Sequence, residues 1–229
     1  MTVGILTHMG LGDHLICNGL VRHFANVHPH ITVYAKHHNV PSVKMMYRDL
    51  QNVAVVGVHD DHDAWQKQAP LTIRTGIFLG PDWNVTKCFC YSFYVNAGLD
   101  RSLMHTGFRI ERNRESEEAF YTKVTKHIGT DKYIVLHEDP SRFTTIVGVD
   151  ESCPVIRICR GYFPIGSDSI FDYCTLIERA HEFHCYDGCF SMMTELLQLR
   201  TKEASFLHRY VRENNDPNTE EFVRFTIVR

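Results

Sequence analysis

The stretch Val3-Gly4-Ile5-Leu6-Thr7-His8-Met9-Gly10-Leu11-Gly12-Asp13-His14 decides the fold of this chain. Its apolar first part is typical of a buried strand, and residues 15–24 continue it with apolar side chains at helical spacing. Glycine suits a short strand-to-helix turn, because it adopts positive φ and allows close backbone approach. The stretch therefore predicts a strand, a tight turn and a helix that carries Asp13 and His14 in its first turn.

Asp13 and His14 stand where an α/β protein binds its ligands. Open parallel sheets bind ligands outside the carboxyl ends of their strands. The first turn of a helix also offers unpaired N–H groups to an anion or a polar substrate group. Aspartate is, however, a favoured helix N-cap. From the local sequence, Asp13 is either a ligand-binding residue or a cap, and both interpretations stay open.

The composition is that of an ordinary globular chain. Its 229 residues are 44% hydrophobic and 22% charged, which is enough for a sizeable core in one large or two small domains. The net charge of −3 and the absence of a basic block argue against a nucleic-acid partner. No apolar run has the length of a membrane span, and Met1 leads directly into a strand instead of a signal peptide. We expect a soluble, cytoplasmic protein.

The cysteines and histidines do not form a recognisable metal motif. The eight cysteines include no Cys-x-x-Cys pair, and in a reducing compartment they are best interpreted as small buried hydrophobes. The run His59-Asp60-Asp61-His62-Asp63 lacks the spacing of the common zinc motifs. Consecutive polar residues after a strand are typical of a solvated loop. We therefore predict neither a disulfide framework nor a metal site.

Strand and helix patterns alternate along the chain, which predicts parallel sheets covered by helices on both faces. In the first half, β-rich runs lie at 31–35, 53–58 and 71–79, and helical patterns lie at 40–50 and 87–99. In the second half, a helix to about residue 127 is followed by strands at 133–137, 155–159, 183–186 and 204–207 and helices at 170–181 and 190–197.

The most polar stretch, 110–118, lies between these two sets and is the best candidate for an interdomain connection. We predict an N-terminal Rossmann-like domain at 1–112, a C-terminal Rossmann-like domain at 113–212 and a tail at 213–229. The predicted fold class is α/β, with two parallel-sheet halves that face a cleft.

Two short motifs resemble the heptosyltransferase-like glycosyltransferases of the GT-B fold. In that family a strand is followed by a Gly-Asp pair and an apolar helix, and Gly12 and Asp13 match this pair. The stretch Cys185-Tyr186-Asp187-Gly188-Cys189-Phe190, with the helix after it, resembles the donor-site turn of the same family. The resemblance spans most of the chain in order, although members of the family are usually considerably longer.

The resemblance implies a GT-B enzyme in which Asp13 is the catalytic base and Gly12 and His14 lie on the acceptor side. It implies transfer of a sugar from a nucleotide-diphosphate sugar to the hydroxyl of a glycan acceptor, with inversion and without a cofactor or a bound metal. A carboxylate often contacts the nucleotide ribose in this fold, and Glu178 is the candidate. The implied donor-side turn consists of Asp187, Gly188, Cys189 and Phe190.

Ser141 and Arg142 follow the predicted strand 133–137, again at the ligand end of a sheet. The planar guanidinium of Arg142 can pair with a diphosphate, and Arg142 resembles a basic residue that the family carries in this loop. Ser141 could donate a further hydrogen bond. The alternative for Arg142 is a surface salt bridge with Glu138 or Asp139.

The turn at Asp187-Gly188-Cys189 lies between a predicted strand and a predicted helix. The backbone N–H groups of Gly188 and Cys189 would then point at a bound anion. Asp187 fits a sugar hydroxyl better than a phosphate, since a carboxylate repels phosphate. A plain helix cap is the alternative for Asp187.

Two other functions stay open. A non-catalytic module of this fold that binds a nucleotide or a glycan would explain the short chain. A nicotinamide-dependent oxidoreductase would explain the strand, Gly10-x-Gly12 and helix, which are similar to a dinucleotide-binding fingerprint. That fingerprint needs a third glycine and an acidic residue after the second strand. Leu15 or Cys17 and then Tyr34-Ala35-Lys36 stand at those places, so this function ranks last.

Overall fold

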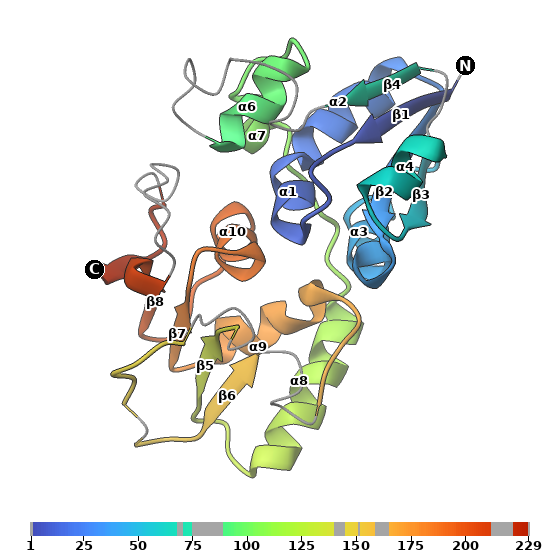
Figure 1. The fold of residues 1–229 in the computed structure, drawn as a ribbon. Helices are drawn as coiled ribbons and strands as arrows, with labels where there is room; N and C mark the ends of the chain where they lie inside the picture. Colours follow the sequence, from blue (N-terminus) through green and yellow to red (C-terminus); the bar gives the residue numbers. More distant parts are fainter. Residues whose placement is uncertain are drawn as a thin grey trace. The chain divides into compact units, whose positions relative to one another are not determined.

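The computed structural model describes residues 2–67, 71–74, 89–139, 145–150, 152–158, 165–211 and 222–228. The chain divides into two compact units, and the boundary between them lies between Glu111 and Arg112. Each unit is built on one β-sheet, and every strand pair in both sheets is parallel (Figure 1). The predicted α/β class with two parallel-sheet halves is confirmed. In the described part of the chain, no helix is both long and apolar enough to cross a membrane.

The first unit contains a four-stranded sheet with the order β3-β2-β1-β4, which matches the first half of a Rossmann fold. Its strands are β1 (Thr2–Leu6), β2 (His30–Lys36), β3 (Val53–Val58) and β4 (Leu71–Arg74). Its helices are α1 (Leu11–Ile16), α2 (Asn18–Val27), η1 (His37–Asn39), α3 (Val40–Met46), α4 (Asp61–Gln66), α6 (Phe89–Asn96) and α7 (Leu103–Thr106).

The central strand β1 is buried from Val3 to Leu6, and only Thr2 at its start is exposed. Val3 and Ile5 are fully buried, as expected for a strand inside a parallel sheet. The single helix that we predicted after this strand is in fact two helices, α1 and α2. They join at Cys17, whose φ of −79° and ψ of 3° interrupt the regular helix.

The second unit contains a five-stranded sheet with the order β6-β5-β7-β8-β9. Its strands are β5 (Ile134–His137), β6 (Val155–Ile158), β7 (Glu182–Cys185), β8 (Ala204–His208) and β9 (Thr226–Val228). Its helices are α8 (Arg114–Ile128), η4 (Ile170–Asp172), α9 (Tyr173–Arg179), α10 (Cys189–Leu196) and η5 (Arg209–Val211). Strand β9 lies in the segment 213–229 that we predicted as a tail, and it adds a fifth strand beside β8.

Helix α8 opens the second unit and has clear signals at both ends. The side chain of Asn113 accepts a hydrogen bond from the backbone N–H of Ser116 at 3.3 Å, and Gly129 ends the helix with a left-handed φ of 73°. Helix α8 packs against α9, which follows η4 directly in the chain (Figure 1). The polar stretch predicted as a connection therefore runs into the first turns of a packed helix.

Helix α2 approaches α7 so closely that only glycine fits at position 19. A Cβ on Gly19 would lie 2.1 Å from the carbonyl oxygen of Leu103. Gly19→Ala normally gains helix propensity, but here the backbone clash outweighs that gain, and we expect a loss of about 1–3 kcal/mol of stability. Thermal and chemical denaturation measure it. The control is Gly166→Ala, because a Cβ at this exposed position meets no atom closer than 4.0 Å. Equal stability of both variants would contradict the packing of α2 on α7.

Candidate functional site

Each sheet has one point where the order of its strands reverses. In the first unit this point lies between β1 and β4, because the chain passes from β1 to β2 and β3 on one side and later returns to β4 on the other. In the second unit it lies between β5 and β7 for the same reason. Ligands of open α/β sheets bind in the crevice outside the carboxyl ends of the strands at such a point. The residues after β1, β5 and β7 are therefore the candidate site residues.

The turn from β1 to α1 is strained at Met9. Its φ is 57°, a left-handed value that is uncommon for a residue other than glycine. Met9 is fully buried, its N–H donates to Thr7 Oγ1 at 3.2 Å, and its carbonyl accepts from Asn39 Nδ2 at 3.2 Å. We predicted that glycine would supply the unusual backbone of this turn. The strained residue is instead Met9, which packing and two hydrogen bonds hold in place.

Asp13 lies in the first turn of α1, and its side chain reaches back to the start of the helix. Its Oδ2 accepts a hydrogen bond from the N–H of Gly10, the N-cap residue, at 3.0 Å. A Cβ on Gly10 would lie only 2.6 Å from this oxygen, so glycine makes the contact possible. Asp13 is therefore not the N-cap itself, although it satisfies one N–H at the helix start. Gly12, beside it in α1, is partly exposed.

His8 is the second polar side chain at this turn. Its Nδ1 lies 3.4 Å from Asp13 Oδ2, and the exposed fractions of the two side chains are 35% and 13%. The hydrogen bond to Asp13 raises the pKa of His8, although partial burial opposes this shift. The charge of Asp61 also raises the pKa, whereas Lys36 lowers it. A polar pair that solvent reaches therefore lies at the carboxyl end of β1.

His14 does not stand on the accessible side of this turn. It is fully buried, and burial lowers the pKa of its ring to about 4, so the ring is neutral. Neither ring nitrogen has a hydrogen-bond partner in the described part of the chain. Helical spacing turns residue 14 inward while residue 13 stays partly exposed, and the acceptor-side role of His14 stays a prediction.

The corresponding point of the second unit is aromatic. His137, the last residue of β5, is 7% exposed, and burial lowers the pKa of its ring to about 3. Its ring stacks on Tyr186 with centroids 4.7 Å apart and contacts Phe190 at 4.5 Å. Phe190 also meets Tyr173 edge-on and is only 5% exposed. Phe190 therefore belongs to the packing around this turn, and its donor-side role stays a prediction.

The turn after β7 has the predicted strand–turn–helix form, with Gly188 as the N-cap of α10. Asp187 precedes the cap, so it is not itself the N-cap, and both Asp187 and Cys189 are partly exposed. The N–H of Gly188 donates to Ser191 Oγ at 3.0 Å, and the Ser191 hydroxyl donates to the Gly188 carbonyl at 2.8 Å. Gly188 would have to exchange this internal bond for a bond to an anion.

Ser141 and Arg142 lie outside the described residues. Glu138, one of the two carboxylates that we considered as a partner of Arg142, is 3% exposed. Its Oε1 accepts from Arg157 Nη1 at 2.8 Å, and its Oε2 accepts from the N–H of Ile146 at 3.1 Å. Both oxygens of Glu138 therefore bind groups within the second unit.

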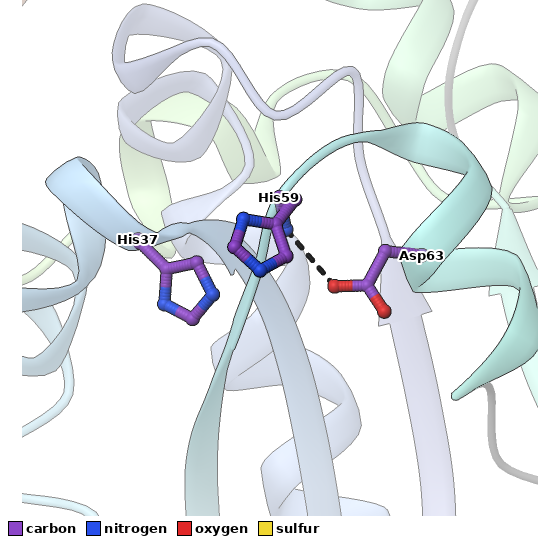
Figure 2. Close-up of side chains that lie close together, drawn as sticks. All are labelled: His37, His59 and Asp63. Atoms are coloured by element: carbon purple, nitrogen blue, oxygen red, sulfur yellow. Dashed lines mark hydrogen bonds between the residues drawn. The ribbon is translucent and has the colours of Figure 1, made fainter.

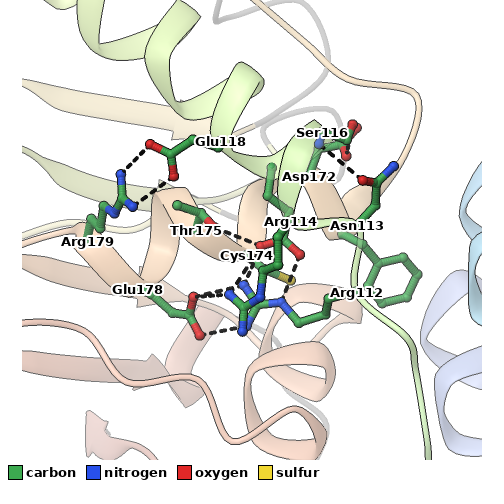
Figure 3. Close-up of polar contacts among 12 residues, drawn as sticks. Arg112, Asn113, Arg114, Ser116, Glu118, Asp172, Cys174, Thr175, Glu178 and Arg179 are labelled. Atoms are coloured by element: carbon green, nitrogen blue, oxygen red, sulfur yellow. Dashed lines mark hydrogen bonds and ion pairs between the residues drawn. The ribbon is translucent and has the colours of Figure 1, made fainter.

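Glu178, whose side chain is 30% exposed, belongs to an ion-pair network with Arg112 and Arg114 (Figure 3). Arg112 donates to Glu178 Oε1 at 2.6 Å and to Oε2 at 2.8 Å, and Arg114 adds a contact at 3.2 Å. Burial is the largest single influence on Glu178 and pushes its pKa upward, but the hydrogen bonds and charges of Arg112 and Arg114 together outweigh it, and the pKa ends below its usual value. A contact with ribose would share this carboxylate with two arginines, and the predicted contact stays a prediction.

Arg112 also binds Glu117 of α8, and this second pair is more deeply buried. The Arg112 nitrogens lie 2.8 and 2.5 Å from the two Glu117 oxygens, and the exposed fraction of the Glu117 side chain is 1%. The hydroxyl of Thr175 donates to Glu117 at 2.7 Å. The first residue of the second unit is thereby joined to both α8 and α9 (Figure 3).

His8 and His137 are the residues of these two points that we did not assign from the sequence. Each is a polar residue at, or two positions beyond, the carboxyl end of a central strand, and this position could have identified it. The ring packing of His137 depends on Tyr186 and Phe190, which lie about fifty residues further along the chain, and no local pattern reveals it.

Comparison with known proteins places this fold in one class. No protein-family model and no curated protein matches the sequence. Solved structures do match: two of them are glycosyltransferases, and one of these two is a glycosyltransferase of family 9. The predicted resemblance to this class is thus confirmed at the level of the fold.

Two structures illustrate the match. One is the family 9 glycosyltransferase from Veillonella parvula DSM 2008, with a TM-score of 0.59 and 12% identity over 99% of this chain and 85% of that chain. The other is the iron-containing dodecameric glycosyltransferase TibC from enterotoxigenic E. coli H10407. It has a TM-score of 0.51 and 14% identity over 90% of this chain and 59% of that chain.

The contact with Asp13 predicts an unusual titration of His8. We expect a pKa above the ordinary value of about 6.5, measured by NMR on the histidine ring protons, and a fall toward that value in Asp13→Asn. Because the folded-state pKa is raised, the stabilisation by this pair is complete below the unfolded-state pKa. It is lost as the pH rises through the folded-state pKa of His8. An unchanged His8 titration in Asp13→Asn would contradict the contact.

The ion pairs of Arg112 and Arg114 predict that replacing each of these two arginines lowers the stability by a different amount. Arg112→Met leaves the buried carboxylate of Glu117 with only a 3.6 Å contact to the exposed Arg114 in place of two short hydrogen bonds, and we expect a loss of about 3–5 kcal/mol in urea denaturation. Arg114 is the matched control, because its side chain is 65% exposed, and Arg114→Met should cost less than about 1 kcal/mol. Equal losses would show that burial does not govern this network.

Proposed function

We propose that the protein is a glycosyltransferase that moves a sugar from a nucleotide-diphosphate sugar to an acceptor hydroxyl. The observation that carries this proposal is the likeness of the fold to a family 9 glycosyltransferase over 99% of the chain. The position of Asp13 supports it, because this carboxylate lies at the strand-order reversal of the first sheet and is partly exposed. A base at such a point can reach a bound acceptor.

Asp13 has one oxygen held and one oxygen available. Its Oδ2 is bonded to the N–H of Gly10 and lies beside His8, whereas its Oδ1 accepts no hydrogen bond from the described residues. A carboxylate that is fixed through one oxygen can present the other in a defined direction, which is the geometry that a general base requires. His8 is a positioning residue in this proposal.

The proposed reaction is a single displacement. Asp13 takes the proton from the acceptor hydroxyl, whose oxygen forms a bond to the anomeric carbon of the donor sugar. The bond from that carbon to the diphosphate oxygen breaks, and the nucleoside diphosphate leaves with the electron pair. Attack opposite the leaving group inverts the configuration at the anomeric carbon. No metal ion takes part in these steps.

The donor side of the proposal rests on the turn between β7 and α10. Asp187 is the proposed acceptor for a sugar hydroxyl, and the N–H groups of Gly188 and Cys189 are the proposed partners of the diphosphate. Ser141 and Arg142 keep their proposed contacts with the same diphosphate, where a charged hydrogen bond contributes about 1.5–3 kcal/mol. Glu178 keeps its proposed contact with a ribose hydroxyl, which it would make beside Arg112 and Arg114.

Asp13→Asn removes the proposed general base but keeps the hydrogen bond at the start of the helix, so it tests the two roles of Asp13 separately. Asparagine keeps the size of the side chain and can still accept from the N–H of Gly10, but it cannot take a proton. We expect a rate that is lower by about 10²–10⁴-fold, with an unchanged melting temperature. Release of nucleoside diphosphate from a panel of UDP, GDP and ADP sugars, with water as acceptor, measures the rate. Asp131→Asn, at an exposed aspartate before β5, is the control and should keep full activity.

Two results would contradict the assignment. Full turnover in Asp13→Asn would show that Asp13 only supports the helix start. Binding of nucleoside diphosphate by the wild-type protein without turnover of any sugar in the panel would favour the non-catalytic binding module.

A further inference from the structure

Three side chains of metal-ligand type meet at the carboxyl edge of the first sheet, on strands that the proposed reaction does not use. His37 directly follows β2, His59 directly follows β3, and Asp63 lies in the first turn of α4 (Figure 2). The last pair of the β2–β3 ladder is Lys36 with Val58. The parallel register therefore brings His37 and His59, the next residues of the two strands, side by side.

The distances within this group suit a single ion. One potential ligand atom from each of the three residues lies within 4.8 Å of the other two. The two imidazole rings have centroids 4.6 Å apart and meet at 62°. Nitrogen and oxygen ligands lie about 2.0–2.2 Å from tetrahedral zinc, so two ligands of one ion are about 3.3–3.6 Å apart. The three atoms must therefore close by about an ångström, which rotation of the exposed His37 and His59 side chains can supply.

Neighbouring residues help to position two of the three side chains, His37 and Asp63. Gly57 lacks the Cβ that would lie 2.6 Å from His37 Nδ1, and this leaves room for the ring over the end of β3. Asp63 Oδ2 accepts from the backbone N–H of His59 at 3.0 Å and from Lys67 Nζ at 2.9 Å. The oxygen of Asp63 that faces the two histidines is the one bonded to His59, and the other oxygen accepts no hydrogen bond from the described residues (Figure 2).

The start of α4 explains why the sequence pattern did not reveal this group. Asp60 caps the helix by accepting from the N–H of Asp63 at 2.9 Å, so 61–66 is a helix and not the solvated loop that we predicted. The helix carries Asp63 back toward the end of β3. The third residue of the group, His37, follows β2 and lies more than twenty residues earlier in the chain.

We propose that His37, His59 and Asp63 form a binding site for a divalent transition-metal ion such as zinc. Two imidazole nitrogens and one carboxylate oxygen suit zinc and its neighbours, whereas calcium and magnesium require oxygen ligands. His37 and His59 are exposed, so water fills the remaining coordination position. The ion links the residues after β2 to the first turn of α4, and it stabilises the folded state by mass action.

Calorimetric titration of the chelator-treated, full-length protein with zinc chloride tests this site. We expect one ion per chain and a melting temperature that rises with zinc concentration. His37→Ala and Asp63→Asn should each weaken zinc binding by more than about 100-fold, since even outer-shell changes at metal sites cost 10–100-fold. His62→Ala is the matched control, because His62 is equally exposed, lies in α4 and bonds to Gln66 instead of the three ligands. It should leave the affinity unchanged.

The variants are first compared without metal, where each should melt as the wild type does. If Asp63→Asn fails this check because it loses the Lys67 contact, His37→Ala and His59→Ala carry the test. Absorption of the cobalt-loaded protein in the visible range gives a second readout, and its band should disappear in the same variants. Equal zinc affinity in His37→Ala, His59→Ala and the wild type would overturn the site and show adventitious binding to surface histidines. No turnover is measured, so this test is separate from that of the proposed function.

Discussion

The parallel pairing of every strand is the constraint on which the rest of the structure depends. Parallel strands place all their carboxyl ends on one edge of a sheet, and each crossover returns the chain to the opposite edge. The strand orders are β3-β2-β1-β4 and β6-β5-β7-β8-β9. Each sheet therefore has one pair of neighbouring strands from which the chain connections run in opposite directions along the sheet. Polar and aromatic residues that follow β1, β5 and β7 are thereby gathered at two defined points. The proposed transferase chemistry and the proposed metal site both use this edge, but at different strands.

The two strand-order reversals carry different chemistry. The point in the first unit is polar and partly exposed, with the His8–Asp13 pair placed by a left-handed Met9 whose backbone is held from both sides. Strain of this kind persists where surrounding contacts overdetermine the backbone, and it concentrates at functional sites. The point in the second unit is an aromatic stack of His137 on Tyr186 beside a glycine-capped helix. A polar point suits proton transfer, and a neutral aromatic point beside helix N–H groups suits a nucleotide.

Much of this architecture could be predicted from the sequence, because hydrophobic periodicity reports local structure directly. The apolar run at β1, the glycine turns and the polar start of α8 all lie where their residue types indicate. Partners that come from distant segments could not be predicted in this way. Glu178 has the pattern of a helix-face charge, and only the packing of α8 on α9 brings Arg112 to it. His14 and Phe190 stand in motifs with a functional resemblance, yet the helical turn directs both inward. His37 and His59 meet only through strand register, which depends on the pairing of two strands and not on either strand alone.

Backbone hydrogen exchange with and without a saturating nucleoside diphosphate tests the central claim most directly, namely that the carboxyl edge of each sheet at the strand-order reversal is the ligand site. UDP, GDP and ADP are compared in turn. The account predicts that one of them slows exchange at residues 186–191, where β7 turns into α10, and leaves the amino ends of the same sheet, at 129–133 and 152–155, unchanged. Slower exchange confined to those amino ends, or no change with any of the three nucleotides, would contradict it.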